Sequence, residues 1–415
     1  MMKSPKKDWV IIYSVVAPYP LQNGAAVRIW EMAQWLRKFY HVGLVMPAAN
    51  GSDLAPLKNG FDGVWIAYPH AISVRRNLLR RIRYEIISIS ARCSLSSRYA
   101  KELAAFSHKN PLGKIHPPAM LLLDELCTKL RPIAIIAEYV FSAATSTIVA
   151  RKHGVLSVID TIDVLSQRQK SERAAGVPQQ RGKFSEKHEI ELLSLADALI
   201  AIQPNEAKLL ADMLPGKPIV IAEHPVVVNE YPSTTTNNSY ILFVSSQAKH
   251  NIHALRIFLE RQWPIIRQTV PETEFHICGN VSHHFSEVTT RENAVVFHGF
   301  CPDIASYYQK ATIAINPVNY GSGLKIKSVE ALAYGKCLVS TPIGADGLEE
   351  HAGRAFVSVE VDQMHEAIIE LLRDPHRRQM LETEALNLAK QRFSPEVCFY
   401  DLTQLLEITS RNQQN

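Results

Sequence analysis

The sequence predicts an α/β protein built from two Rossmann-like, doubly wound domains. At 415 residues the chain exceeds one ordinary domain, and its 47% hydrophobic content is enough to bury two cores. Short apolar runs, typical of buried parallel strands, alternate with segments of helical periodicity in both halves. Residues 231–239 are polar and without periodicity. We therefore predict an N-terminal domain over 1–230, a linker over 231–239 and a second domain over 240–392.

The first half begins with an apolar run that ends at Pro18 and Pro20, followed by a loop and a helix over 25–39. Residues 74–101 are basic, with leucine and isoleucine at helical spacing, and predict an amphipathic helix. The polar stretch 167–187 contains glycine and proline, and we interpret it as a mobile loop over an acceptor. The predicted strands are 10–16, 42–46, 133–137, 155–159, 198–202 and 219–222, and a helix is predicted over 205–213.

The second half repeats the alternation of strands and helices. Ser394-Pro395-Glu396 has the serine cap and first-turn proline of a helix start, so the chain is predicted to end in a helix. The predicted strands are 241–245, 275–278, 295–297, 313–318 and 337–341, with helices over 253–269, 303–310 and 324–334.

The stretch 314–348 contains the clearest chemical signal. A buried strand leads into the turn Gly321–Gly323, a helix follows to Gly335, and another strand begins at Cys337. Glycines let a backbone approach a ligand, and a helix start directs free N–H groups outward. Lys325 and Lys327 add positive charge there. The turn therefore predicts an anion site, for which a diphosphate is the most fitting guest.

Two common phosphate motifs do not fit this stretch. The Lys327-Ser328 pair lacks the spacing and second glycine of a P-loop, and a dinucleotide fingerprint needs a third glycine near the start of a domain. Glu330 belongs to neither motif, because it lies on the helix away from its start. A carboxylate there can accept two hydrogen bonds from vicinal hydroxyls, as on a ribose. Together these features predict a site for a nucleoside diphosphate.

This combination resembles the retaining glycosyltransferases of the GT-B fold, specifically family 4. The match consists of Gly323, the run Glu330-Ala331-Leu332-Ala333-Tyr334-Gly335 and the strand ending Ser340-Thr341-Pro342. The family's first glutamate, eight residues before the second, is replaced by Ser322. The resemblance implies two domains facing a central crevice, with the last helix, 393–415, crossing back to the N-terminal domain. A plain crossover of any doubly wound sheet remains the alternative.

The resemblance also implies which residues bind the donor. Family members place paired glycines in the first loop, of which Gly24 remains, and hold the nucleobase through backbone after a strand, here at Gly299 and Phe300. A tight turn is the alternative role for Gly24. The candidate donor-binding residues are Gly24, Gly299, Phe300, Ser322, Gly323, Leu324, Lys325 and Glu330.

Candidate catalytic residues lie at strand ends. Glu138 and Asp163 follow two apolar strands, and the carboxyl ends of parallel strands face the ligand crevice. We expect these carboxylates to contact the acceptor or the transferred sugar, whereas Asp160 also fits a simple turn cap. By resemblance, Lys249 becomes a phosphate ligand in place of the family's arginine and lysine, although a plain surface lysine fits as well. Asp163, Glu138 and Lys249 are therefore the candidate catalytic residues.

The charge distribution points to an acidic partner. Residues 1–220 carry 29 Lys+Arg against 18 Asp+Glu, whereas residues 221–415 carry 16 against 22. No reading motif or interleaved aromatics accompany the basic residues, which argues against nucleic acid. The basic helix within 75–101 fits an anionic membrane surface, and a solvated face on a core-packed helix would show the same pattern.

Several features favour a cytoplasmic location. The six cysteines are scattered without metal-ligand spacing and are interpreted as reduced thiols. The apolar run after the first lysines is short and suits a strand better than a signal peptide, and no run approaches the length of a membrane span. We expect a cytoplasmic protein, peripheral on the inner face of the membrane if the basic helix binds lipid.

The function predicted from these features is a hexosyltransferase-type glycosyltransferase of polysaccharide biosynthesis. It would move a sugar from a nucleotide-diphosphate sugar to a glycan or lipid-linked acceptor, with retention implied by the resemblance. No D-x-D motif occurs in a suitable context, so no metal or other cofactor is expected. The missing first glutamate keeps open a GT-B-like subunit that binds a nucleotide sugar or a partner without transfer. A GT-B sugar-nucleotide epimerase is the third option.

Overall fold

A computed structural model describes residues 7–21, 23–48, 54–68, 85–95, 99, 101, 113–177, 185–228, 240–285 and 294–414. The chain divides into two compact units. Unit 1 comprises Met1–Gln167, Gln179–Glu223 and Phe399–Asn415, and unit 2 comprises Arg168–Pro178 and His224–Cys398. Each unit contains one parallel sheet, so the predicted pair of doubly wound α/β domains is confirmed. The linker predicted over 231–239 lies outside the described residues.

Unit 1 is built on a parallel sheet with the strand order β3-β2-β1-β4-β5-β6-β7. The chain reverses its direction of travel between β1 and β4, which pair directly, Val10 opposite Ala134. Ligands of doubly wound sheets bind at the carboxyl ends beside such a switch point. The strands are β1 (Trp9–Tyr13), β2 (His41–Ala48), β3 (Gly63–Tyr68), β4 (Ala134–Glu138), β5 (Leu156–Asp160), β6 (Ala198–Ala201) and β7 (Ile219–Ile221).

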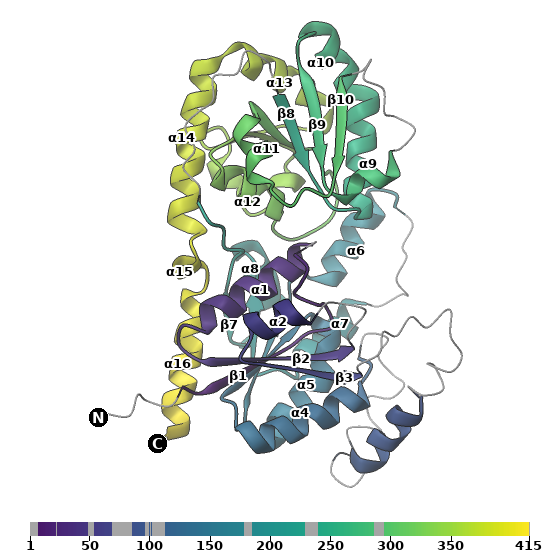
Figure 1. Cartoon of the computed structure of the whole chain (residues 1–415), viewed down its shortest axis with the longest axis vertical. Coiled ribbons are helices and arrows are strands. Elements are labelled where there is room, and N and C mark those ends of the chain that lie inside the picture. Colours follow the sequence, from purple (N-terminus) through teal and green to yellow (C-terminus); the bar gives the residue numbers. More distant parts are fainter. Residues whose placement is uncertain are drawn as a thin grey trace. The chain divides into compact units, whose positions relative to one another are not determined.

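Helices cover both faces of this sheet, with α4 and α5 on one face and α1 and α2 on the other (Figure 1). Apolar side chains of the strands and of α4, α5 and α7 form one buried core on the α4–α5 side. The helices of the first half include α1 (Gly24–Leu36), α2 (Ala55–Gly60), α4 (Pro117–Leu130), α5 (Ala143–His153), α6 (Leu165–Ala174), α7 (Glu186–Leu193) and α8 (Pro204–Met213).

The loop predicted over 167–187 is wrong in its first part, because residues 165–174 form α6. Its sequence is polar throughout and has no apolar stripe, so periodicity could not reveal the helix. The start of α6 is held from another helix instead. Glu189 on α7 accepts hydrogen bonds from the N–H groups of Leu165 at 2.8 Å and Ser166 at 2.9 Å. A buried carboxylate at a helix N-terminus satisfies orphan donors and complements the helix dipole.

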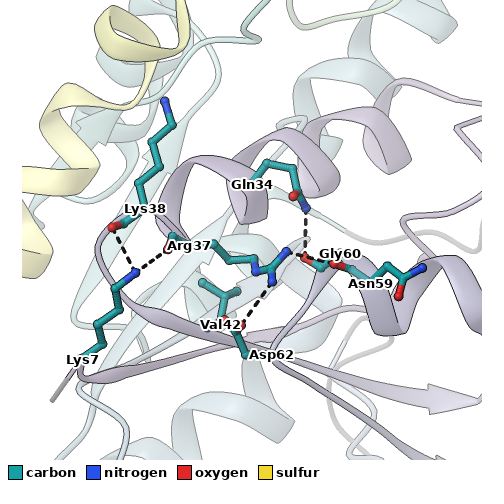
Figure 2. A network of polar contacts seen from close by, with 8 residues as sticks. All are labelled: Lys7, Gln34, Arg37, Lys38, Val42, Asn59, Gly60 and Asp62. Carbon is teal, nitrogen blue, oxygen red and sulfur yellow. Dashed lines mark hydrogen bonds and ion pairs between the residues drawn. The ribbon is translucent and has the colours of Figure 1, made fainter. Parts of the chain in front are cut away.

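Polar contacts fix the C-terminal end of α1 (Figure 2). Lys7 donates to the carbonyl oxygens of Arg37 at 3.0 Å and Lys38 at 3.2 Å, which places a cation at the negative end of the helix. Arg37 pairs with Asp62 at 3.2 Å, and Asp62 also accepts the Val42 N–H at 2.8 Å. These contacts tie the end of α1, whose first residue is Gly24, to the start of β2.

Unit 2 repeats the same topology with the strand order β10-β9-β8-β11-β12-β13, all parallel. The switch point lies between β8 and β11, which pair at Ile241 and Ile313. The strands are β8 (Tyr240–Val244), β9 (Glu274–Cys278), β10 (Val295–Gly299), β11 (Ile313–Asn316), β12 (Cys337–Ser340) and β13 (Val357–Ser358).

The helix predicted over 253–269 is interrupted in the structure. It consists of α9, one π-helical turn at Phe258–Gln262, and α10. Pro264 lies in the first turn of α10, where it lacks an N–H and its ring crowds the preceding turn. The helices of this unit are α9 (Lys249–Ile257), α10 (Trp263–Thr269), α11 (Ala305–Lys310), α12 (Ile326–Ala333), α13 (Met364–Arg373), α14 (Pro375–Arg392) and α15 (Pro395–Cys398).

The last helix, α16 (Tyr400–Gln414), belongs to unit 1, which agrees with the predicted return of the chain. Trp35 donates from its indole nitrogen to the Thr403 hydroxyl at 3.0 Å, and Ser410 donates to Asp8 at 2.6 Å. Leu402 and Leu406 are fully buried. The C-terminal helix therefore completes the packing of α1 and the β7 edge.

Part of the predicted basic helix is described. Residues 85–95 are helical, and the five arginines between 75 and 83 lie outside the described residues. Ile86 and Ile89 are 61% and 58% exposed, whereas Ala91 and Leu95 are buried. Across the described part of the chain, no helix has both the length and the apolar content to cross a membrane.

Candidate functional site

The glycine turn between β11 and α12 forms as predicted, although the helix starts later. Gly321 has φ +123° and Gly323 has φ +76°, conformations that residues with a Cβ rarely adopt. α12 begins at Ile326, two residues after the predicted start, because Lys325 is an extended N-cap. The Lys325 ammonium turns back and donates to the carbonyl oxygens of Ser322 at 2.9 Å and Gly323 at 2.6 Å. Lys325 thus closes the turn from within, and Leu324 is buried beside it.

Lys327 and Glu330 lie one turn apart on α12 and therefore on the same face. The Lys327 ammonium hydrogen-bonds Asn251 Oδ1 and lies 5.4 Å from the centre of the Phe243 ring. Burial lowers the pKa of Lys327 to about 7, with a smaller contribution from Lys325. Burial likewise raises the pKa of Glu330 to about 7, opposed by Lys327. Both groups are half-buried and titrate near neutral pH, where each can change charge with a ligand.

The start of α9 approaches the same face of α12. Asn251 donates from Nδ2 to the Ser246 carbonyl at 3.1 Å and hydroxyl at 3.2 Å, which fixes its amide to accept from Lys327. Burial holds the pKa of His250 well below its usual range, and the cations Lys327, Arg168 and Lys325 lower it further. Lys249 is exposed at the first position of α9. Its predicted contact with phosphate stays a prediction, and His250 and Asn251 are the α9 residues that line the cluster.

A buried network positions α12 against the sheet. Asn316, at the end of β11, donates from Nδ2 to the Ser328 hydroxyl at 2.8 Å and to the Gly344 carbonyl at 2.9 Å. Ser328 also donates to Gly344 at 2.7 Å, and the Thr341 hydroxyl accepts the Gly344 N–H at 2.9 Å. These bonds join the ends of β11 and β12 to the first turn of α12. These bonds fix the direction of the glycine turn that precedes α12.

The predicted nucleobase position lies at the end of β10. Gly299 has φ +66°, and its carbonyl accepts the Gly279 N–H at 2.5 Å and the Cys301 thiol at 3.4 Å. Phe300 follows with 53% of its surface exposed. An exposed aromatic ring is suited to stack on a base. The role of Gly299 and Phe300 nevertheless stays a prediction.

Unit 1 carries a second polar cluster at the carboxyl ends of β4 and β5. Glu138 lies opposite Asp160 in the sheet, and both are fully buried. Arg28 from α1 forms a bidentate pair with Asp160, Nε to Oδ2 at 2.7 Å and Nη2 to Oδ1 at 3.0 Å. Its third nitrogen donates to the Glu223 carbonyl at 3.2 Å. Asp160 therefore does more than cap its turn, although it also accepts the Ile162 N–H at 3.4 Å.

Glu138 is the unusual member of this cluster. Neither of its carboxylate oxygens has a hydrogen-bond partner among the described residues. Burial, and then the charge of Asp160, raise its pKa well above the usual range, while Arg28 opposes the shift. A buried carboxyl group without a partner is held as the neutral acid. Glu138 therefore supplies an O–H donor and an acceptor at the switch point of this sheet.

The remaining predicted residues lie near this edge. Asp163 is 9% exposed, in the turn between β5 and α6, and its charge raises the pKa of Glu189 slightly after burial and hydrogen bonds are considered. Gly24 is the first residue of α1, and Asn23 caps that helix by accepting the Ala26 N–H at 3.0 Å. Gly24 is thus part of a helix start.

Sequence reasoning missed four residues of these clusters. Arg28 looked like an ordinary residue of an amphipathic helix, and Asn251, His250 and Arg168 belong to no motif. The helices on which they lie, α1, α9 and α6, are far from Glu138 and Glu330 in the sequence. Only the pairing of the elements in space brings them together, so no spacing rule could have found them.

The comparison with protein families matches the second half of the chain. Residues 238–374 match the family described as glycosyl transferases group 1. This region contains α9, the glycine turn and α12, and therefore the whole cluster around Glu330 apart from Arg168.

Two curated relatives match over shorter stretches. An uncharacterized 44.6 kDa protein in the cps region of Klebsiella pneumoniae is 26% identical over 153 residues, 34% of this chain and 39% of that protein. A poly(glycerol-phosphate) alpha-glucosyltransferase of Bacillus subtilis (strain 168) is 25% identical over 174 residues, 39% of this chain and 25% of that protein. The chain thus spans well under half of the length of both relatives.

Solved structures match over nearly the whole chain. Sucrose-phosphate synthase from Thermosynechococcus elongatus has a TM-score of 0.73 at 14% identity, covering 98% of this chain and 100% of the other. Anabaena Alr3699/HepE, solved in complex with UDP and glucose, has a TM-score of 0.68 at 15% identity, covering 97% and 99%. The fold is that of the GT-B glycosyltransferases, and the predicted resemblance is confirmed at this level. The assignment to family 4 stays a prediction.

Proposed function

We propose that this protein transfers a hexosyl group from a nucleoside-diphosphate sugar to a glycan or lipid-linked acceptor. The observation that carries the proposal is the arrangement on α12, where a glycine turn precedes Lys327 and Glu330. The turn offers backbone N–H groups to a phosphate. Lys327 offers an amino group that becomes protonated near pH 7, and Glu330 offers a carboxylate that can accept hydrogen bonds from vicinal hydroxyls. The match of residues 238–374 and the UDP bound to Alr3699/HepE support this assignment of the donor.

Departure of the sugar leaves a diphosphate with developing negative charge. In our proposal Lys327 and the N–H groups of the turn stabilise that charge, with Lys325 holding the turn in shape. These groups supply the positive field that a metal ion provides elsewhere, so we expect no metal requirement. Turnover that is unchanged by EDTA and by added Mg²⁺ or Mn²⁺ would support this, and restoration of activity by one of the ions would contradict it.

We place acceptor recognition on unit 1, at Glu138 and Asp163. The neutral Glu138 carboxyl group can donate to and accept from an acceptor hydroxyl, and Arg28 with Asp160 fixes the surrounding charge. Retention of anomeric configuration is proposed from the fold family. Glu138→Gln should raise the acceptor KM or lower kcat while leaving the dissociation constant of UDP unchanged. Exposed Glu125 on α4 gives a matched control, Glu125→Gln.

A membrane-linked acceptor would explain the basic segment 75–101, and we propose that it binds an anionic bilayer from the cytoplasmic side. The exposed Ile86 and Ile89 would add apolar contact. Replacing Arg75, Arg76 and Arg80 by glutamine should reduce sedimentation with vesicles containing anionic lipid, at about 1 kcal/mol per charge. The control variant replaces the exposed Lys58, Lys129 and Lys208 by glutamine, which removes the same amount of charge from unit 1. Equal loss in both variants would mean that the segment is only a solvated face.

A donor screen followed by a product assay tests the proposed function. Thermal shift with UDP-, GDP-, ADP- and dTDP-sugars identifies the donor, and chromatography then separates transfer, hydrolysis and epimerisation. Donor binding with transfer to a glycan or lipid acceptor would support the proposal. Binding without turnover would identify a non-transferring subunit, for which Ser322 in place of the glutamate is the relevant difference. Conversion of the donor to its epimer would identify an epimerase.

A further inference from the structure

The segment Arg168–Pro178 lies between strands of unit 1 in the sequence but groups with unit 2 in space. Its helical part is the C-terminal portion of α6. The Ser171 hydroxyl accepts the N–H of Gly321 at 2.9 Å, so this portion of α6 lies directly on the glycine turn. Gly321 is the first residue of that turn, with φ +123°. A contact from the first half of the sequence thus reaches the predicted diphosphate position.

Arg168 lies three residues before Ser171 and therefore on the same face of α6. It is partly buried, and its Nε pairs with Glu172 at 3.3 Å. The charge of Arg168 acts on two groups of the cluster. After burial and Lys327, it lowers the pKa of His250, and it opposes the rise in the pKa of Tyr320 that burial and Glu172 cause. Tyr320 in turn packs edge-on against His250, with ring centres 6.2 Å apart. Arg168 is therefore next to the space between the turn and the start of α9.

Several cationic side chains converge on this space. After burial, Lys327, Arg168 and Lys325 each lower the pKa of His250, so their positive charges act on the same point. Glu172 pairs with Arg168, and Glu330 opposes the lowering of the Lys327 pKa that burial causes. Positive charge is thus concentrated beside the glycine turn. Such a concentration of charge is suited to a ligand with more than one negative charge.

We propose that Arg168 binds the diphosphate of the donor, with Ser171 positioning α6 on the glycine turn. A guanidinium offers two parallel N–H donors to phosphate oxygens, so it would hold the terminal phosphate as the sugar departs. Ser171 keeps a hydroxyl proton to donate toward the same ligand while it accepts from Gly321. The proposal rests on the proposed function, because it assigns a residue to the same donor site. It adds that this site is built from two distant parts of the sequence.

The test compares nucleoside diphosphate with monophosphate. Isothermal titration of the full-length protein with UDP, GDP, ADP and dTDP first identifies the base, and the matching monophosphate serves as the reference. Arg168→Ala should reduce the preference for diphosphate over monophosphate at least tenfold, while monophosphate affinity stays within twofold. Arg168→Lys should restore part of the preference, because it keeps the positive charge. The restoration should be incomplete, because lysine lacks the two parallel N–H donors of the guanidinium. Retained monophosphate binding also reports that the variant is folded.

Arg173→Ala is the matched control. It removes the same charge from the same helix, but Arg173 is exposed and its Nε donates to the Gln169 carbonyl at 3.3 Å. At five residues from Arg168 it points to another side of α6. Equal preference in Arg168→Ala and wild type, or equal loss in Arg173→Ala, would overturn the role of Arg168 and leave the donor assignment standing. Failure of the wild-type protein to bind any of the four diphosphates would overturn the proposed function, and this inference with it.

Discussion

Glu330 and Lys327 are both poised to change charge near pH 7, with opposite consequences for a bound nucleotide. As the pH falls through about 7, Lys327 gains a proton and attracts phosphate more strongly. Glu330 also gains a proton, and a neutral carboxyl group accepts hydroxyl hydrogen bonds less well. The protonation of Lys327 and that of Glu330 therefore change the affinity for a nucleotide in opposite directions. Measuring each one requires a ligand that separates the contribution of the ribose from that of the phosphates.

The affinity ratio of UDP to 2′,3′-dideoxy-UDP isolates the ribose. Because both ligands carry the same phosphates, the effect of Lys327 cancels in the ratio. We expect the ratio to fall several-fold from about pH 8 to about pH 6 in wild type, as Glu330 becomes protonated. At high pH, Glu330→Gln should lower the ratio by a factor that corresponds to about 1–3 kcal/mol of binding free energy. The substitution should also remove the pH dependence of the ratio. A ratio that is independent of pH in wild type would remove Glu330 from the ribose site.

A second prediction at this scale concerns the stability contribution of Glu138. Its pKa in the folded protein is raised well above that in the unfolded chain, so the folded state favours the proton. Stability from this group is therefore fully present below the unfolded pKa and is lost as the pH rises toward the folded pKa. Glu138→Gln keeps the shape without the titration, so its stability relative to wild type should increase with pH. Urea unfolding at several pH values measures this, with exposed Glu125→Gln as the control that makes the same substitution at the surface.

The pair of Arg28 and Asp160 makes a contrasting case in the same cluster. Both are fully buried, and Arg28→Met would leave the Asp160 carboxylate without its partner. Loss of one member of a buried ion pair costs about 3–5 kcal/mol, so Arg28→Met should lower the free energy of unfolding of unit 1 by that order. The double variant Arg28→Met/Asp160→Asn should recover part of the loss. A double variant less stable than Arg28→Met alone would show that Asp160 has other essential partners.

At the scale of elements, the buried strands were predicted well because parallel strands are covered on both faces and appear as continuous apolar runs. β4, β5, β8 and β12 all lie within one residue of their predicted start. α6 was missed for the opposite reason, since its polar side chains carry no periodic apolar face. The sequence also placed the start of α12 at Leu324, because it could not show that Lys325 would turn its ammonium back onto Ser322 and Gly323.

The same reasoning explains which positions in the candidate site could be predicted. Glu330, Gly323 and Glu138 stand in fixed relation to a turn or a strand end, so local pattern was enough to place them in the fold, and their roles stay predictions. The cation predicted after β8 is Lys249, which is exposed, whereas Arg168 reaches the cluster from 81 residues earlier in the sequence. Pairings across such distances depend on the packing of whole elements, which one sequence alone does not determine.

Gly344 offers a test of how closely α12 is tied to the sheet. A Cβ there would lie 2.4 Å from the Ser340 hydroxyl and 2.8 Å from the Asn316 carbonyl oxygen. Gly344→Ala should therefore cost about 1–3 kcal/mol through overpacking and displace the network that holds α12. UDP affinity should fall with it, because the glycine turn precedes that helix. A variant of normal stability and affinity would mean that the network is not required for the position of the turn.

At the scale of the whole molecule, the chain passes between its two units more than once. Unit 2 takes residues 168–178 from the first half, and unit 1 takes α16 from the C-terminus. Each unit nevertheless has its own sheet and its own core. Described residues that surround the glycine turn all group with unit 2, including Arg168 and Ser171. A nucleotide should therefore act on the stability of one unit in particular.

Differential scanning calorimetry with a pair of matched variants tests this division. Leu406 on α16 and Leu371 on α13 are both buried, one in each unit, and each truncation to alanine should cost about 2–5 kcal/mol. Leu406→Ala should lower the transition of unit 1, and Leu371→Ala that of unit 2. UDP at a hundredfold excess over its dissociation constant should stabilise by about 2.7 kcal/mol the transition that Leu371→Ala lowers, and leave the other in place. If UDP moved the transition that responds to Leu406→Ala instead, the donor site would belong to unit 1, and the assignment of the glycine turn as its centre would be wrong.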